Sequence, residues 1–182
     1  MKKIFIIFFI INLNNFALGT INENIINKLQ NIDNLSFEFE QNINGKIESG
    51  NCTIEYPKKI FCEYERSNNK LLVSNGRSLV IKSRSSYYIY PLHKTPLNFI
   101  LDKQFLIDRI SNLEERVIGG NLINYTISEN NNELSIFFDN KTFDLIGWQN
   151  TDIYQNSSIT FLSSIKKNRM LSKNLFILPS HN

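Results

Sequence analysis

The sequence has few of the residues from which catalytic and metal sites are usually built. Its only two histidines, His93 and His181, stand far apart, and neither has a cysteine, a second histidine or a nucleophile motif at ligand spacing. No glycine-rich phosphate loop, G-x-S-x-G or H-E-x-x-H motif occurs. The adjacent Glu114 and Glu115 would point to opposite faces of a strand. We therefore expect no enzyme, no cofactor and no metal site.

Neither positive nor negative charge is in large excess. The formal net charge is +3, and it falls to +1 if Lys2 and Lys3 are removed with a signal peptide. No stripe of Lys and Arg with interleaved aromatic residues is present. The densest basic cluster, residues 166–169, is typical of a solvated turn. We expect no nucleic-acid partner.

Long apolar runs are missing except at the N-terminus. Met1-Lys2-Lys3 precedes an apolar stretch from Ile4 to Ile11, and Ala17-Leu18-Gly19 resembles a cleavage site before Thr20. A membrane anchor is the alternative, but a bilayer span needs ~20 apolar residues. We interpret residues 1–19 as a secretory signal peptide and residues 20–182 as a single domain in the periplasm. No cysteine stands at the cleavage site, so we do not expect the protein itself to be lipid-modified.

Period-two alternation dominates the rest of the chain. Residues 22–33 show helical spacing, Thr95-Pro96 is typical of a helix start with Thr95 as N-cap, and residues 104–110 extend the helical part. Strands are predicted at 35–41, 52–56, 60–65, 70–74, 78–83, 87–90, 113–118, 122–128, 134–139, 143–154, 158–165 and 176–178. This order predicts an α+β domain with one large, curved antiparallel sheet and its helices on one face.

The two cysteines fall on facing strands of a predicted hairpin. If its turn is centred on Pro57, Ile54 faces Ile60 and Cys52 faces Cys62. Directly opposed residues lie close enough for a disulfide, and export brings them into an oxidising compartment. The alternative is a pair of small buried thiols that replace apolar residues. We favour the disulfide, as a structural bond.

The apolar and aromatic side chains of these strands gather on one face of the sheet. Phe37 and Phe39 alternate with glutamates on one strand. On another, Ile60, Cys62 and Tyr64 share one face of the strand. Most such faces are plain protein core. The residues alone therefore leave open whether this face is packed or holds a ligand.

Several short motifs follow one another along the chain. An amphipathic helix leads into Phe37-Glu38-Phe39-Glu40-Gln41, Gly50 begins the strand into Pro57, and Leu72-Val73-Ser74-Asn75-Gly76, Thr95-Pro96-Leu97 and Phe176-Ile177-Leu178-Pro179 come later. In order and spacing they resemble the periplasmic outer-membrane lipoprotein carrier family, LolA. The resemblance covers essentially all of the chain after the signal peptide.

The resemblance implies an incomplete, half-open β-barrel with a helical lid over its apolar concave face. Its expected cargo is the acyl chains of lipoproteins, received from an inner-membrane ABC exporter and delivered to an outer-membrane receptor by a monomeric chaperone. The acyl chains must be shielded from water, because removing each CH₂ from water is favourable by ~0.8 kcal/mol. The implied lid residues are Leu97, Ile100 and Leu101. The implied cavity residues are Phe37, Phe39, Ile54, Ile60, Tyr64, Leu72, Leu79, Ile81, Tyr88, Tyr90, Ile136 and Trp148.

One position departs from the family pattern. Many members have an arginine immediately before the proline that ends the strand, where it helps to hold the lid shut. Tyr56 stands there instead, with Lys58 and Lys59 beyond the proline. A phenol offers one donor where a guanidinium offers five. We therefore expect the lid lock to be different or absent.

A second function is compatible with the same architecture. An envelope sensor module would recognise a lipid or a misassembled envelope component as part of a signalling complex. Such sensors usually carry a second domain, which we do not expect in a chain of 182 residues. We favour the carrier.

Overall fold

The computed structural model describes residues 19–129, 132–151 and 156–181, so the predicted signal peptide up to Leu18 lies outside the described residues. The helices are α1 (Ile21–Gln30), the 3-10 helix η1 (Leu92–Lys94), α2 (Leu97–Ile100) and α3 (Lys103–Ile110). The strands are β1 (Asn34–Ile43), β2 (Lys46–Glu55), β3 (Lys59–Tyr64), β4 (Leu71–Asn75), β5 (Ser78–Lys82), β6 (Tyr87–Pro91), β7 (Arg116–Ile118), β8 (Leu122–Glu129), β9 (Asn132–Asp139), β10 (Leu145–Thr151) and β11 (Ser157–Lys167).

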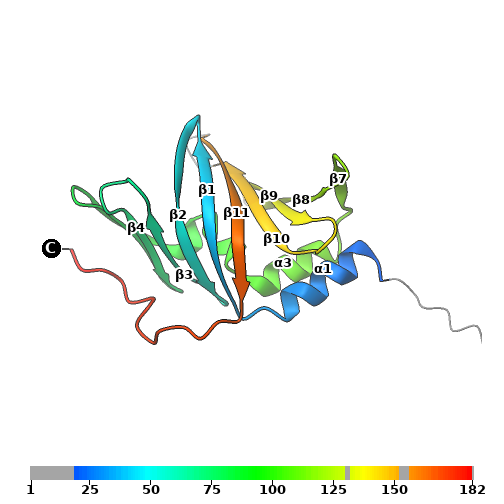
Figure 1. The fold of residues 1–182 in the computed structure, drawn as a ribbon, viewed down its shortest axis with the longest axis horizontal. Helices are drawn as coiled ribbons and strands as arrows, with labels where there is room; N and C mark the ends of the chain where they lie inside the picture. The colour runs from blue at the N-terminus through cyan, green and yellow to red at the C-terminus, as the bar shows by residue number, and fades with distance from the viewer. Residues whose placement is uncertain (1–18, 130–131, 152–155, 182) are drawn as a thin grey trace, which may run out of the picture.

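The described strands form one antiparallel sheet, as predicted. Their order is β6-β5-β4-β3-β2-β1-β11-β10-β9-β8-β7, so β6 and β7 are its two edges and the sheet is open. Figure 1 shows the sheet curving, with α1 and α3 lying along one side of it. No helix in the described ranges is long and apolar enough to cross a membrane.

Helix α1 is held in place at its N-terminal turn. The Thr20 hydroxyl accepts from the Glu23 backbone N–H, and the Glu23 carboxylate accepts from the Thr20 N–H, so the helix begins with a capping box. Asn22 Nδ2 donates to the carbonyl oxygens of Ile110 and Leu113, each at 3.0 Å, and Asn22 Oδ1 accepts from the Tyr125 hydroxyl. These contacts join α1 to the end of α3 and to strand β8.

The hairpin of β2 and β3 has the predicted register. Cys52 lies opposite Cys62, and Ile54 lies opposite Ile60. On the same face Gly50 lies between Phe39 and Tyr64. A Cβ atom on Gly50 would stand 2.9 Å from Phe39 Cε1 and 2.1 Å from the Glu63 carbonyl oxygen, so only glycine fits there.

The centre of the sheet joins the two ends of the chain. Strand β1 pairs with β2 on one side and with β11 on the other. Phe39 lies opposite Leu162, and Gln41 lies opposite Thr160. The face that carries these residues is the one that the helices cover, since its apolar side chains belong to one buried cluster with Ile25, Leu29, Leu106 and Ile110.

Two local predictions were wrong. Residues 176–178 form no strand: Phe176 lies in a turn beneath Lys59, 5.6 Å from its Nζ, and the following segment binds Lys82 and Tyr87 through the carbonyls of Ser180 and Pro179. Strand β11 lies between β1 and β10, so it has no free edge with which this segment could pair. The segment contacts the side chains of Lys59, Lys82 and Tyr87 instead. Thr95 is not an N-cap. Its hydroxyl donates to the Leu92 carbonyl of η1, and Pro96 takes the capping position.

Candidate functional site

A hollow opens between the sheet and the segment that precedes α2. Its empty volume is about 760 Å³, which includes space open to solvent, and no charged side chain from the described ranges lines it. The lining comes from strands β1 to β5, β10 and β11 and from three residues on the helical side. The lining residues are Phe37, Phe39, Gln41, Cys52, Ile60, Cys62, Tyr64, Leu72, Leu79, Ile81, Thr95, Pro96, Leu97, Trp148, Asn150, Ser158 and Thr160.

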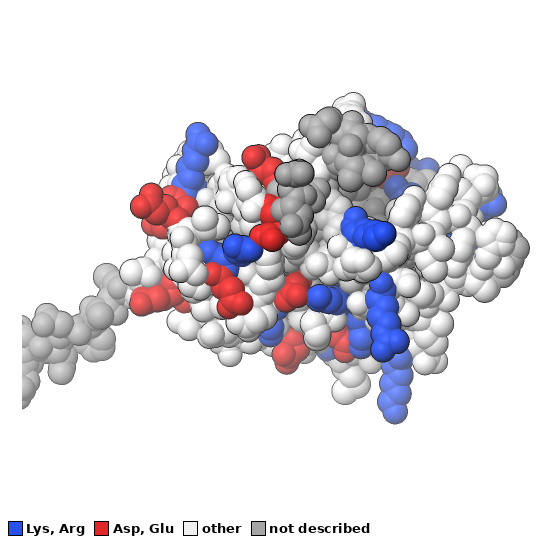
Figure 2. All heavy atoms as spheres, turned by 180° about the vertical axis from the view of Figure 1, so that it is seen from behind, with Lys and Arg blue, Asp and Glu red and all other residues white. Residues whose placement is uncertain are grey.

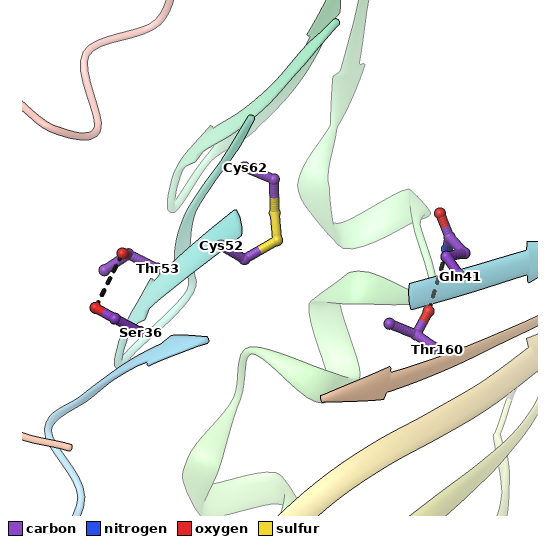
Figure 3. The surroundings of a disulfide bond; sticks show 6 residues. All are labelled: Ser36, Gln41, Cys52, Thr53, Cys62 and Thr160. Atoms are coloured by element: carbon purple, nitrogen blue, oxygen red, sulfur yellow. Dashed lines mark hydrogen bonds between the residues drawn. A yellow bond between two sulfur atoms is a disulfide. The ribbon is translucent and has the colours of Figure 1, made fainter. Parts of the chain in front are cut away.

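One wall of the hollow is apolar. Two pairs of aromatic rings meet edge to face: Phe39 with Tyr64 at 5.0 Å, and Phe37 with Trp148 at 6.3 Å between ring centres. Cys52 and Cys62 are bonded, with an S–S distance of 1.99 Å, and Figure 3 shows their sulfurs on the side of the helical segment. Burial and then the Glu48 charge raise the pKa of Tyr64, so its phenol is uncharged at physiological pH.

The other wall is polar but uncharged. Gln41 Nε2 donates to Ser158 Oγ at 2.8 Å and to Thr160 Oγ1 at 3.2 Å, and Asn150 lies beside them, opposite Ser158 in the register. Ser158 and Thr160 are buried. This cluster could not be predicted from the sequence, because its residues lie on strands far apart in the chain and nothing local indicates that β1 and β11 pair.

The structure brings together most of the residues that the resemblance implied. Those that line the hollow are Phe37, Phe39, Ile60, Tyr64, Leu72, Leu79, Ile81 and Trp148 from the sheet, and Leu97 from the opposite side. Ile54, Ile136, Ile100 and Leu101 do not line it. They are almost fully buried in the cluster between the sheet and the helices, where protein side chains already fill the space.

Tyr88 and Tyr90 also lie away from the hollow. They pair with Ile81 and Leu79 on the same face of the sheet, but they stand on the edge strand β6, where 53% and 43% of their surface is exposed. The two rings stack on each other at 6.4 Å. Figure 2, which views the molecule from behind, shows mostly uncharged surface along the margin on the β4 side of the sheet.

The Tyr56 side chain does not supply the hydrogen bonds that an arginine at this position could donate. Its hydroxyl is buried and has no hydrogen-bond partner among the described residues, and burial raises its pKa. Lys58 connects this turn to the helical segment instead. Its backbone N–H donates to the Leu101 carbonyl at 2.8 Å, and its Nζ lies 3.2 Å from Asp102 Oδ2.

A buried carboxylate lies next to the hollow. Glu48 accepts hydrogen bonds from the ammonium groups of Lys46 and Lys70, and Lys70 Nζ stands 3.9 Å from the centre of the Tyr64 ring. Burial alone would raise the pKa of Glu48, but the two lysines outweigh burial and hold it below its usual value. The charges of Glu48, Lys46 and Lys70 are thus paired with one another, and none of the three residues lines the hollow.

These features fit a sequence family. The model of the outer membrane lipoprotein carrier protein LolA matches residues 30–178. The chain belongs to the LolA family. The match includes every residue that lines the hollow. No curated protein matches the sequence.

Several solved structures are similar to this LolA-family chain, each with little sequence identity. An uncharacterized conserved protein from Thermus thermophilus is 6% identical, with a TM-score of 0.51, over 87% of this chain and 92% of that one. A LolA superfamily protein from Nitrosomonas europaea is 9% identical, with a TM-score of 0.45, over 88% and 99%. LprF from Mycobacterium bovis is 11% identical, with a TM-score of 0.46, over 85% and 95%. The likeness to the Thermus protein concerns the open-sheet fold alone.

Proposed function

We propose that this protein is a periplasmic carrier that holds the acyl chains of lipoproteins in the hollow and shuttles them from an inner-membrane exporter to an outer-membrane receptor. The observation that carries the proposal is the hollow itself. It is a largely apolar space on the covered face of an open sheet in a LolA-family chain, and none of its lining residues in the described part of the chain is charged. Several acyl chains cannot cross an aqueous compartment unshielded, because each CH₂ in water costs ~0.8 kcal/mol.

In this proposal the segment from Thr95 to Leu101 is the lid. Thr95, Pro96 and Leu97 face the sheet across the hollow, while Ile100 and Leu101 anchor the segment in the buried core. A lid that covers apolar space when cargo is absent competes with cargo for the same surface. The cost of opening then lowers the affinity for cargo, which allows the cargo to be handed on.

The proposal is tested by displacing a fluorescent acyl probe from the purified protein. Leu97→Asp places a carboxylate in the hollow without removing a core residue, and we expect probe affinity to fall at least tenfold because the charge has no partner there. Ile47→Asp is the control, since Ile47 is 62% exposed on the opposite face of β2. Equal affinities for the two variants would refute binding in the hollow.

Carriage of lipoproteins needs its own test. Native mass spectrometry of the protein isolated from the periplasm should show a co-purifying acylated protein. A free lipid bound without any acylated protein would favour the sensor module.

A further inference from the structure

Gln41, Ser158 and Thr160, with Asn150 beside them, form a small polar cluster in the wall of a largely apolar hollow. We call the first three residues the amide–hydroxyl cluster. All three residues line the hollow. Figure 3 shows Gln41 and Thr160 on the same side of the sheet as the disulfide, whereas the Ser36 and Thr53 pair points away. A buried polar cluster in such a wall is costly unless its groups find partners.

The cluster does not use all of its own donors. An amide carries two N–H donors and each hydroxyl carries one, so the three side chains hold four donor hydrogens. Two hydrogen bonds join them, Gln41 to Ser158 and Gln41 to Thr160, and they use two of the four. Turning the amide by 180° changes which hydrogens are used but not the number. Within the described part of the chain, no other side-chain bond to the three residues exists. Two donors therefore remain available.

The charge around the cluster restricts what it can bind. Among the described residues none that lines the hollow is charged, and the nearby lysines Lys46 and Lys70 are paired with Glu48. A free carboxylate would enter without a cation to neutralise it, at a large desolvation cost. A neutral carbonyl oxygen accepts hydrogen bonds and carries no such cost. Two donors side by side match a pair of carbonyl groups.

We propose that the amide–hydroxyl cluster binds the carbonyl oxygens of ester- or amide-linked acyl groups, so that the hollow selects acylated glycerol-type ligands over free fatty acids and plain alkyl chains. This inference rests on the proposed function and adds the chemical class of the ligand. It also gives the ligand a direction. The carbonyl end lies at β1, β10 and β11, and the alkyl chains extend toward Leu72, Leu79 and the disulfide.

The test compares three neutral or acidic probes of equal chain length. They are dioctanoylglycerol, its ether analogue dioctylglycerol, which lacks the carbonyls, and octanoate. We expect the wild-type protein to bind the ester about tenfold more tightly than the ether, the factor for one or two net hydrogen bonds. Octanoate should bind more weakly than the ester. In Gln41→Leu/Ser158→Ala/Thr160→Val, which removes all four donor hydrogens of the cluster, the ester-to-ether ratio should fall to near one.

A matched variant controls for changes in the sheet. Ser36→Ala/Thr53→Val removes a hydroxyl pair at 3.1 Å on the opposite face of the same sheet, and the ester-to-ether ratio should be unchanged. The ratio is measured within each variant, so a general loss of stability does not alter it. A wild-type ratio near one, or an unchanged ratio in Gln41→Leu/Ser158→Ala/Thr160→Val, overturns the inference and leaves the proposed function standing. If the protein binds none of the probes, both are wrong.

Discussion

Lys58 offers a direct way to measure how firmly the helical segment is held. Its ammonium lies 3.2 Å from Asp102 Oδ2, and the side chains are 36% and 28% exposed, so solvent screens the pair and its contribution stays below ~1 kcal/mol. Lys58→Met keeps the aliphatic stem and removes the charge. The backbone bond from Lys58 to the Leu101 carbonyl remains in the variant.

If this ion pair helps to hold the segment over the hollow, its loss makes opening easier. If loss of the pair lowers the free energy of opening by up to ~1 kcal/mol, the apparent affinity for the probe rises by up to about fivefold. The rise should be largest at low ionic strength and shrink at 1 M salt, where the Debye length is only ~3 Å. Titration of a fluorescent acyl probe at both salt concentrations measures it.

Lys59→Met is the matched control, because Lys59 pairs with Glu55 at 2.8 Å and makes no bond to the helical segment. We expect the probe affinity of this variant to equal that of the wild type. The reasoning is refuted if Lys58→Met and Lys59→Met behave alike, or if the effect of Lys58→Met does not depend on salt.

Three further predictions concern stability. Tyr56→Phe removes a buried hydroxyl without a partner and should raise the free energy of unfolding by about 1 kcal/mol in urea denaturation; a clear decrease would mean that the hydroxyl has a partner. The Cys52–Cys62 bond closes a loop of 10 residues, so reduction should cost ~3 kcal/mol, and two free thiols in unreduced, denatured protein would disprove the bond. Because the pKa of Glu48 is lower in the folded than in the unfolded protein, its stabilisation is complete above about pH 4.5 and is lost as the pH falls through the folded value; Glu48→Gln should lack this part of the acid loss, and parallel pH profiles would contradict the assignment.

Local patterns in the sequence predicted the elements well because most neighbours in this sheet are also neighbours in the chain. Pro57 fixed the turn between β2 and β3, and from that turn the pairing of Cys52 with Cys62 follows. The apolar run of residues 176–178 has the same local pattern as a strand. It forms none: Phe176 lies in a turn against Lys59, and the residues after it contact β5 and β6 through the side chains of Lys82 and Tyr87.

The extent of the hollow could not be predicted in the same way. Alternation places Ile54 on the same face as Ile60, but it does not tell which part of that face the helices cover. The amide–hydroxyl cluster depends on a pairing between Gln41 and Thr160, which are 119 residues apart. Polar residues on a predicted apolar face gave no local signal, because their partners are known only once β1 and β11 are placed side by side.

The position of β11 between β1 and β10 has a consequence for the order of folding. Strands β1 to β6 and strands β7 to β10 each follow one another as neighbours, so each group can form from local contacts. The hollow takes residues from both groups and from β11 itself, and the loop that must close to join them is long. We expect this joining step to come late and only after the last strand has been synthesised. If the hollow binds lipid as proposed, a growing chain would then have no site for lipid, which protects it from taking up membrane lipid before its fold is complete.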